Sequence, residues 1–528
     1  MNTFSKSPAP VGTQPNRLLS YFLPSMADVV FIALFVGLCY GNPRLQLLSD
    51  AGIGWHIRTG EWILQHHAVP HTDLFSNVPT RVWFAWEWLF DVVIAAIHSL
   101  AGLNGVLAFS AFLMALCFAL LLRWTLRLGA PWLITLTFVA LAILSSTVHA
   151  LARPHLVTWL FTLVCWYVLE QKRNTTWLWL MPVLVLVWAN VHGGFLVALA
   201  LMGLCFTGDV LQVLSRRDRE SAAPPYHFGV PAHYDLLNLA SVMTASFVAS
   251  LFNPYGLRLY LHIYEYLGDR FIRQHNLEMQ PPNFHSIGAR SFVILLVLAA
   301  LIVVGNCRQL GPRQALILIF FAVAGLFSAR NVPLAAMVVT MTAAPLLSRR
   351  IEDTNEESAQ NRFTVAIRKF SRRMGLMETL ARGHIWVIVL VSLAIVACGD
   401  SGRLFGTQII QAGFNRERFP LRAVQFLSQG PVRGPLFTSD AWAGYVIYRQ
   451  WPRLQLVIDD RHDMYGSAYM RDYLTTIRGE KDWQEKLAAS GAHTVLIAQN
   501  SNLAVLLRQS PSWQITYEDD QAVVFETR

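Results

Sequence analysis

Residues 49–60 read Ser49-Asp50-Ala51-Gly52-Ile53-Gly54-Trp55-His56-Ile57-Arg58-Thr59-Gly60 and come directly after the first strongly apolar segment, 26–43. An aspartate, a histidine and an arginine therefore lie close together at a membrane exit. Such ionisable side chains must face water, a cavity or a bound head group, because lipid penalises their charge heavily. The stretch predicts a functional site rather than a spacer.

The rest of the composition is that of a membrane protein. The chain has 528 residues, of which 54% are hydrophobic and 14% charged, and its mean hydropathy is +0.40. These values are typical of proteins that cross a bilayer several times. The net charge of +9 comes from basic residues scattered between apolar segments. This pattern fits loops at an anionic lipid surface, so we expect the lipid bilayer, and no nucleic acid, as a partner.

Charge-poor segments predict the helices, because a bilayer core requires about 20 mostly apolar residues per helix. The segment 174–208 is too long for one helix, and Asn190-Val191-His192-Gly193-Gly194 near its middle predicts a tight turn between two. We expect about eleven transmembrane helices and a mainly α fold. The segments are 26–43, 92–122, 128–152, 154–169, 174–208, 236–257, 291–307, 314–329, 331–348 and 383–399.

Basic residues favour one orientation. Cytoplasmic loops carry an excess of lysine and arginine, and the loop 349–382 is strongly basic. Placing this loop inside predicts a multi-pass protein of the inner (plasma) membrane with a cytoplasmic N-terminus. The predicted parts are a tail 1–25, a transmembrane domain 26–399 with outer loops 44–90 and 253–290, and a periplasmic or extracellular α/β domain 400–528.

Polar side chains gather on the outer face of this topology. Arg153 and Arg330 lie there in very short turns, where interfacial snorkelling would explain either one alone. The other polar residues predicted on the outer face favour a site. The inner turns, by contrast, carry few histidines. The outer set is Asp50, His56, Arg58, Glu87, His149, Arg153, His155, Asn190, His192, Asn253 and Arg330.

The first outer loop carries three further features. Residues 60–67 predict a short amphipathic helix, and Asp50 and Asp73 form a weak candidate pair for a divalent cation. Tryptophans 83, 86 and 88 bracket Glu87 before the chain re-enters the membrane. Tryptophans at this depth are typical interfacial anchors.

The region 400–528 predicts a small α/β domain. Its run Asp459-Asp460-Arg461-His462-Asp463 follows an expected strand, where site residues of α/β domains often lie. The acids could bind a metal or a sugar, or they could cap a helix and pair with Arg461, and we favour the second. The expected strands are 432–437, 445–448, 455–458, 494–498 and 522–525, and the expected helices are 420–429, 467–477 and 481–490.

An acid just past the first helix, a long first outer loop and a soluble outer tail together resemble the GT-C glycosyltransferase superfamily. The run Asp50-x4-Trp55-His56-Ile57-Arg58-x-Gly60 is similar to the first-loop acid, aromatic, histidine and arginine of these enzymes. The Trp-His-Ile-Arg-Thr-Gly, Asn-x-His-Gly-Gly and Asn-Pro-Tyr-Gly stretches resemble those of bacterial GT-C-like membrane proteins. The run 440–445 departs from the oligosaccharyltransferase signature, since it lacks the Trp-Asp pair.

The resemblance implies transfer of a sugar from a polyprenyl-phosphate-linked donor to a glycan, lipid or protein acceptor. It implies Asp50 as general base, or as ligand of a divalent cation (Mg or Mn), with His56 relaying a proton. Arginines suit the phosphate because guanidinium pairs with its oxygens in bidentate fashion. The expected substrate-binding and phosphate-binding residues are Arg58, Glu87, Arg153, His155, Asn190, His192, Asn253 and Arg330.

A non-enzymatic transporter or assembly scaffold for lipid-linked glycans or polysaccharides is the alternative, since intramembrane ionisable residues also mark transport pathways. A transporter should show internal repeats with charges near the bilayer middle. The sequence shows no repeat, and its polar residues gather at one face. Both observations favour the enzyme.

Overall fold

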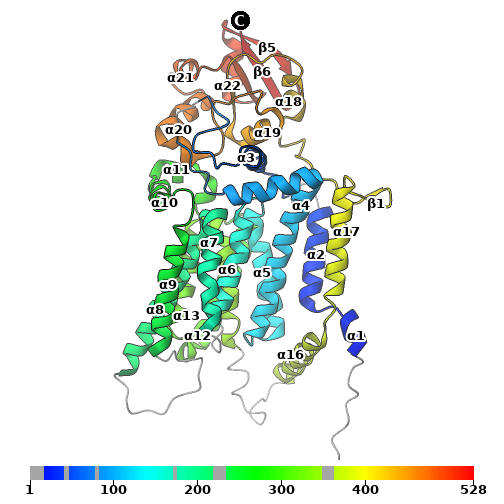
Figure 1. The fold of residues 1–528 in the computed structure, drawn as a ribbon, viewed down its shortest axis with the longest axis vertical. Coiled ribbons are helices and arrows are strands. Elements are labelled where there is room, and N and C mark those ends of the chain that lie inside the picture. Colours follow the sequence, from blue (N-terminus) through cyan, green and yellow to red (C-terminus); the bar gives the residue numbers. More distant parts are fainter. Residues whose placement is uncertain (1–16, 41–46, 78–81, 171–174, 218–232, 348–361) are drawn as a thin grey trace, which may run out of the picture.

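The computed structural model describes residues 17–40, 47–77, 82–170, 175–217, 233–347 and 362–528. A bundle of roughly parallel and antiparallel helices carries an α/β domain at one end (Figure 1). The first-loop helix α3 (Ile53–His66) and the helices α10 (Arg258–Gly268) and α11 (Arg270–His275) lie at that end too. Helices α1 (Arg17–Phe22) and α16 (Arg362–Leu380) lie at the opposite end. The helices of the two predicted outer loops therefore lie at the same end as the C-terminal domain, and the basic helix α16 lies at the other end.

Each expected membrane segment contains a helix. Helices satisfy their own backbone hydrogen bonds, which apolar surroundings demand. Within the described ranges, five helices are long and apolar enough to cross a membrane, Ser20–Tyr40, Trp88–Arg127, Trp132–His149, Gly193–Ser215 and Ile287–Gly305. The bundle helices are α2 (Met26–Tyr40), α4 (Trp88–Arg127), α5 (Trp132–Ser146), α6 (His155–Glu170), α7 (Leu180–Val191), α8 (Leu196–Arg217), α9 (His233–Ser250), α12 (Ile287–Gly305), α13 (Pro312–Phe327), α14 (Val332–Ala343) and α17 (Ile385–Gly399).

Two breaks shape the end of the bundle that carries the α/β domain. The predicted turn in 174–208 is confirmed, because α7 ends at Val191 and α8 begins at Leu196. The prediction for 92–122 is wrong in extent. Helix α4 changes direction at Gly102, whose φ of 57° and ψ of −155° favour glycine. The part before Gly102 runs across the end of the bundle (Figure 1).

The C-terminal domain is built on a mixed four-stranded sheet in the order β3-β4-β6-β5. Strands β3 (Leu436–Thr438) and β4 (Thr494–Ala498) are parallel, whereas β5 (Trp513–Glu518) and β6 (Ala522–Thr527) complete the sheet with antiparallel pairs. A separate hairpin joins β1 (Arg403–Leu404) to β2 (Thr407–Gln408). The helices are α18 (Leu421–Leu427), α19 (Asp440–Gln450), α20 (His462–Arg478), α21 (Trp483–Ala489) and α22 (Asn502–Gln509).

Three local predictions are corrected here. Residues 445–448 lie in α19 rather than in a strand, because a short apolar run does not distinguish a buried strand from a buried helical turn. Residues 455–458 form only isolated bridges through Leu456. Helix α3 begins at Ile53, so the predicted helix 60–67 is only its second half.

The first loop and the C-terminal domain pack so closely that their backbones are in direct contact. A Cβ added at Gly54 would lie 2.2 Å from the carbonyl oxygen of Gly444, and one added at Gly444 would lie 2.2 Å from that of Ala51. Leu456 adds two backbone hydrogen bonds of 2.9 Å, donating to Phe75 O and accepting from Asn77 N. Only glycine permits this approach of α3 and α19, so the two segments form one packed unit.

Candidate functional site

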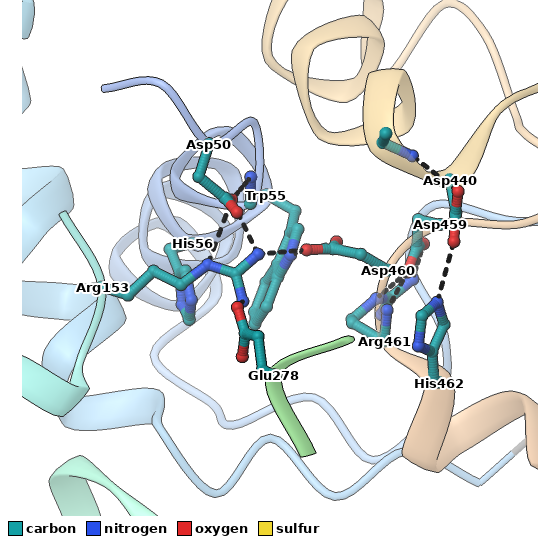
Figure 2. A network of polar contacts seen from close by, with 12 residues as sticks. Asp50, Trp55, His56, Arg153, Glu278, Asp440, Asp459, Asp460, Arg461 and His462 are labelled. Atoms are coloured by element: carbon teal, nitrogen blue, oxygen red, sulfur yellow. Dashed lines mark hydrogen bonds and ion pairs between the residues drawn. The ribbon is translucent and has the colours of Figure 1, made fainter. Parts of the chain in front are cut away.

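Asp50, Arg153 and Asp460 meet where the bundle touches the C-terminal domain (Figure 2). Asp50 Oδ1 accepts hydrogen bonds from Gly52 N at 2.7 Å and from Arg153 Nε and Nη2 at 3.0 and 2.6 Å. The same Nη2 donates to Asp460 Oδ2 at 2.7 Å, and Trp55 Nε1 donates to Asp460 Oδ1 at 2.8 Å. One guanidinium therefore joins two carboxylates from distant parts of the sequence.

Burial and neighbouring charges shift the pKa values of Arg153 and Asp460. Burial would lower the pKa of Arg153, but Asp50, Glu278 and Asp460 raise it well above its ordinary value, so the guanidinium stays charged. Glu278 approaches Arg153 Nη1 at 3.7 Å. Burial raises the pKa of Asp460 to about 6, against the opposing effect of Arg153. A permanently charged guanidinium therefore lies beside Asp460, a carboxyl whose pKa is raised.

A large cavity of about 470 Å³ opens on the bundle side of Arg153. Arg273 and Arg330 also line it, and neither makes an ion pair in the part of the chain that the structure describes. The Nε atom of Arg273 is buried without a hydrogen-bond partner there. Other polar lining residues are Glu87, Asp91, His149, His155, Thr158, His192, Asn276, Glu278, Ser328, Asn331, Asp460, Arg461 and Asp463. The cavity thus contains both carboxylates and guanidinium groups, and Arg273 and Arg330 are the guanidinium groups that can bind an anion there without first breaking an ion pair.

Histidines in this cavity are held in fixed orientations. His192 Nδ1 accepts from Thr158 Oγ1 at 2.8 Å and from Gly194 N at 3.1 Å, so the proton of the neutral ring lies on Nε2. Nε2 points toward Glu87 Oε1 at 3.5 Å. The His155 ring contacts the carbonyl oxygen of His149 at 2.9 Å.

Glu87 is expected to make stability depend on pH near neutrality. Burial raises its pKa to about 8, with a further contribution from Asp463. A carboxyl whose pKa is higher in the folded state binds more protons when folded. Its stabilising contribution is therefore complete below its ordinary pKa of 4.5 and is lost as the pH rises through about 8. Glu87→Gln should remove this part of the pH dependence of thermal unfolding.

The exposed Glu417 supplies the matched control for that measurement. Glu417→Gln should unfold with the wild-type pH dependence. An unchanged pH dependence in Glu87→Gln would show that Glu87 is ionised in the folded protein at neutral pH.

A smaller cavity of about 150 Å³ lies on the other side of Arg153 and Asp460, against the C-terminal domain. Asp50 lines this smaller cavity, together with Arg418, Asp440 and Trp442. Arg153 and Asp460 line both cavities. The two cavities thus meet at one ion-paired group.

Asp440 extends the polar wall of the smaller cavity. Its Oδ2 lies 3.1 Å from His462 Nε2, and its Oδ1 accepts from Tyr473 OH at 3.1 Å. Burial opposes the charge of His462, but Asp440 raises the pKa of the ring above its ordinary value. The pair presents a fixed, hydrogen-bonded carboxylate to the cavity (Figure 2).

Two of the expected site residues, His56 and Arg58, lie away from the two cavities. His56 is 1% exposed, stacks on Trp55 and contacts Asp91 Oδ1 at 2.6 Å, so it lines neither cavity. Arg58 donates to Glu61 Oε2 at 2.6 Å and to the carbonyl of Tyr448, away from both cavities.

Two further expected site residues, Asn190 and Asn253, form hydrogen bonds with backbone and side-chain groups of the bundle and its turns. Asn190 donates to the carbonyls of Leu186 and Phe252, each at 2.9 Å, and accepts from Trp88 Nε1. Asn253 Oδ1 accepts from Tyr255 N at 2.8 Å and so shapes its own turn. Neither lines the cavities described above.

The acidic run 459–463 fits both interpretations in part: one aspartate pairs with Arg461, and another lies in the candidate site. Asp459 pairs with Arg461, whose Nε and backbone N lie 2.9 and 3.0 Å from Asp459 Oδ1, whereas Asp460 faces the site. Arg461 also reaches Asp73 Oδ1 at 2.6 Å. Its guanidinium lies over the ring of Trp83, 4.4 Å from the centroid. Trp83, 3% exposed, is therefore a buried platform rather than an interfacial anchor.

The residues present do not fit the divalent cation that the resemblance implies. In the ranges that the structure describes, no group of three or more His, Cys, Asp or Glu side chains is arranged to hold a metal ion. Asp50 and Asp460 both bind Arg153 Nη2, and Asp73 binds Arg461. We therefore derive no step through a metal.

Asp460, Glu278 and Arg273 are among the lining residues that the sequence analysis does not place in the predicted site. Asp460 has a signal in its place after an apolar run, but the favoured interpretation assigns that run to a helix cap. Glu278 and Arg273 lie among many charged residues of the loop 253–290, and nothing in their spacing distinguishes them.

Comparison with known proteins finds similarity in structure. No family model matches the chain, and no curated protein matches its sequence. The apo crystal structure of the oligosaccharyltransferase from Archaeoglobus fulgidus is similar with a TM-score of 0.52 at 10% identity, covering 90% of this chain and 69% of that one. The crystal structure of ArnT from Cupriavidus metallidurans bound to undecaprenyl phosphate gives 0.49 at 14% identity, covering 95% and 96%. The similarity to the oligosaccharyltransferase shows that the chain has a GT-C-like fold.

Proposed function

We propose that this protein is an integral membrane glycosyltransferase that transfers a sugar from a polyprenyl-phosphate-linked donor to a glycan, lipid or protein acceptor. The observation that carries the proposal is the pair Arg273 and Arg330, which line the large cavity without a carboxylate partner among the described residues. An arginine that makes no direct ion pair in a cavity has guanidinium donors available for a phosphate ligand. The GT-C-like fold supports the same reaction class. The reaction would take place at the outer face of the inner membrane.

The two cavities suggest how donor and acceptor would be arranged. The donor phosphate would lie by Arg273 and Arg330 in the large cavity, and the acceptor hydroxyl would enter through the smaller one. Arg153 stands between them and can compensate charge that develops on the departing phosphate. Glu87, protonated near neutral pH, can donate a hydrogen bond to a phosphate oxygen.

Asp50 is the residue we propose as general base. Both oxygens of Asp460 are occupied, by Trp55 and Arg153, whereas the contacts of Asp50 found in the described structure all fall on Oδ1. Asp50 Oδ2 would accept the hydroxyl proton as the acceptor oxygen bonds to the anomeric carbon. The bond from that carbon to the phosphate oxygen breaks, and the phosphate leaves with the electron pair. Attack from the opposite side would invert the anomeric centre.

The test is transfer by the purified protein from a panel of polyprenyl-phosphate sugars, with products identified by mass spectrometry. A glycosylated acceptor together with free polyprenyl phosphate is the expected result. Binding of polyprenyl phosphate without turnover of any donor would instead favour a transporter or scaffold.

Arg330→Gln is expected to weaken the use of the donor. Loss of one charge-assisted hydrogen bond of about 1.5–3 kcal/mol should lower kcat/KM by about 10–100-fold, mainly through a higher KM for the donor. Arg290→Gln is the control, because Arg290 is an exposed arginine of α12 outside both cavities. An unchanged donor KM in Arg330→Gln would remove this arginine from the phosphate site.

A further inference from the structure

A second basic cavity lies at the end of the bundle opposite to the C-terminal domain. It has a volume of about 420 Å³, and its lining residues come from α16, from the last turn of α4, and from the starts of α5 and α17. Figure 1 shows these helix ends opposite the C-terminal domain. Arg123, Arg127, Arg382 and His384 line it, together with Ser371 and Glu378. It is remote from both cavities of the proposed active site and plays no part in the proposed reaction.

Arg123, the least exposed of the three arginines of this cavity, is positioned by His384. His384 Nδ1 lies 2.8 Å from Asp28 Oδ1, and His384 Nε2 lies 3.2 Å from both Nη atoms of Arg123. With its proton on Nδ1, the ring donates to Asp28 and accepts from Arg123. Ser25 donates twice to the second oxygen of Asp28, each time at 2.8 Å. The charge of Arg123 therefore has no direct carboxylate contact within the described structure.

The remaining charges leave an excess of positive charge. Arg127 and Arg382 are exposed, and neither forms an ion pair in the described ranges. Glu378 is the acid among the lining residues, and its Oε2 accepts from Met26 N at 2.8 Å. Three guanidinium groups thus face the cavity with one carboxylate, and this balance favours an anion.

Apolar and aromatic side chains close in sequence to the lining residues are exposed on α1, α16 and α17, and we call them the apolar rim. They include Phe22, Leu376, Leu380, Ile385 and Trp386. Trp386 Nε1 donates to Phe22 O at 3.0 Å, which ties α17 to α1. A Cβ at Gly383 would lie 2.5 Å from Leu23 C, so this corner is packed closely. Basic groups within an aromatic rim at the ends of membrane helices are typical of a lipid surface.

We infer that this cavity binds the phosphate of an anionic phospholipid, whose acyl chains lie along the exposed apolar side chains of α16 and α17. The guanidinium groups supply bidentate donors for the phosphate oxygens. The apolar rim is what distinguishes a lipid from a free phosphate ion, which would gain nothing from it. In the predicted orientation, this face meets the cytoplasmic leaflet, where anionic lipids are abundant.

The test measures binding of phosphatidylglycerol to the delipidated full-length protein in neutral detergent by native mass spectrometry. The test variant is Arg127→Gln/Arg382→Gln, which changes two exposed side chains and so leaves the fold intact. We expect its affinity for phosphatidylglycerol to be at least about tenfold weaker than that of wild type, since each charge-assisted hydrogen bond contributes that much. Arg373→Gln is the matched control, an exposed arginine of α16 outside the cavity, and should bind as wild type does.

Two results would overturn the inference. Equal weakening in Arg373→Gln and in the double variant would mean diffuse attraction to a basic surface. Displacement of phosphatidylglycerol from wild type by an equal concentration of inorganic phosphate would mean a site for a free ion. Because none of these variants touches the two cavities near Asp50, sugar transfer is measured independently of this outcome.

Discussion

Asp50→Asn should reduce kcat for sugar transfer by at least about 100-fold, the lower part of the range for a general base. Asparagine keeps the shape of the side chain and an acceptor oxygen for Gly52 N and Arg153, but it takes up no proton at neutral pH. The donor phosphate is expected to bind in the other cavity, so the donor KM should change little. The loss should therefore appear in kcat.

Asp520→Asn is the matched control, since the Asp520 side chain is 86% exposed. It should retain full activity. An active Asp50→Asn protein beside an inactive Asp460→Asn protein would transfer the role of base to the second carboxylate that Arg153 holds. Activity in both variants would remove this group from the reaction.

Arg461→Leu should cause the largest loss of stability. Arg461 is 3% exposed and joins Asp459 to Asp73, whose side chains are fully buried. Removing one partner of a buried ion pair costs about 3–5 kcal/mol, because the remaining charges stay buried without compensation. The substitution also removes the cation from the face of Trp83, so the first loop and the C-terminal domain lose a shared anchor.

Thermal unfolding in detergent, with limited proteolysis of the C-terminal domain, would measure this effect. Arg478→Leu is the control, because the Arg478 side chain is 51% exposed and its ion pair with Glu480 lies at the surface. Surface pairs of this kind contribute about 0–1 kcal/mol. Equal destabilisation by both substitutions would show that the buried network contributes no more than a surface pair.

The sequence predicts the bundle well because apolar length is a local property. The expected membrane segments each contain a helix, and the break at His192 lies where the Asn-Val-His-Gly-Gly run places it. Prediction fails where the hydrophobic periodicity is ambiguous. Residues 445–448 are an example, because so short an apolar run does not distinguish a strand from a helix. Strand β5 is missed because its side chains are largely half-exposed or exposed.

The site is only partly predictable, for a geometric reason. Trp55, His56 and Arg58 are neighbours in sequence, but α3 turns successive side chains about 100° around its axis. They consequently face Asp460, Asp91 and Tyr448 respectively. Proximity in sequence suggests one shared site, whereas the helix distributes the residues over three surroundings. The partner that matters, Asp460, lies in another domain, and a single sequence contains no signal for that contact.

The contact of Gly54 with Gly444 limits how substrates can enter and leave. At this backbone distance, α3 and α19 have no intervening side chains that could repack to let the C-terminal domain swing outward. Substrates then reach Arg153 and Asp460 through the mouths of the two cavities rather than through an opening between α3 and α19. We expect a donor held in one cavity and an acceptor in the other to bind in either order, since neither blocks the path of its partner.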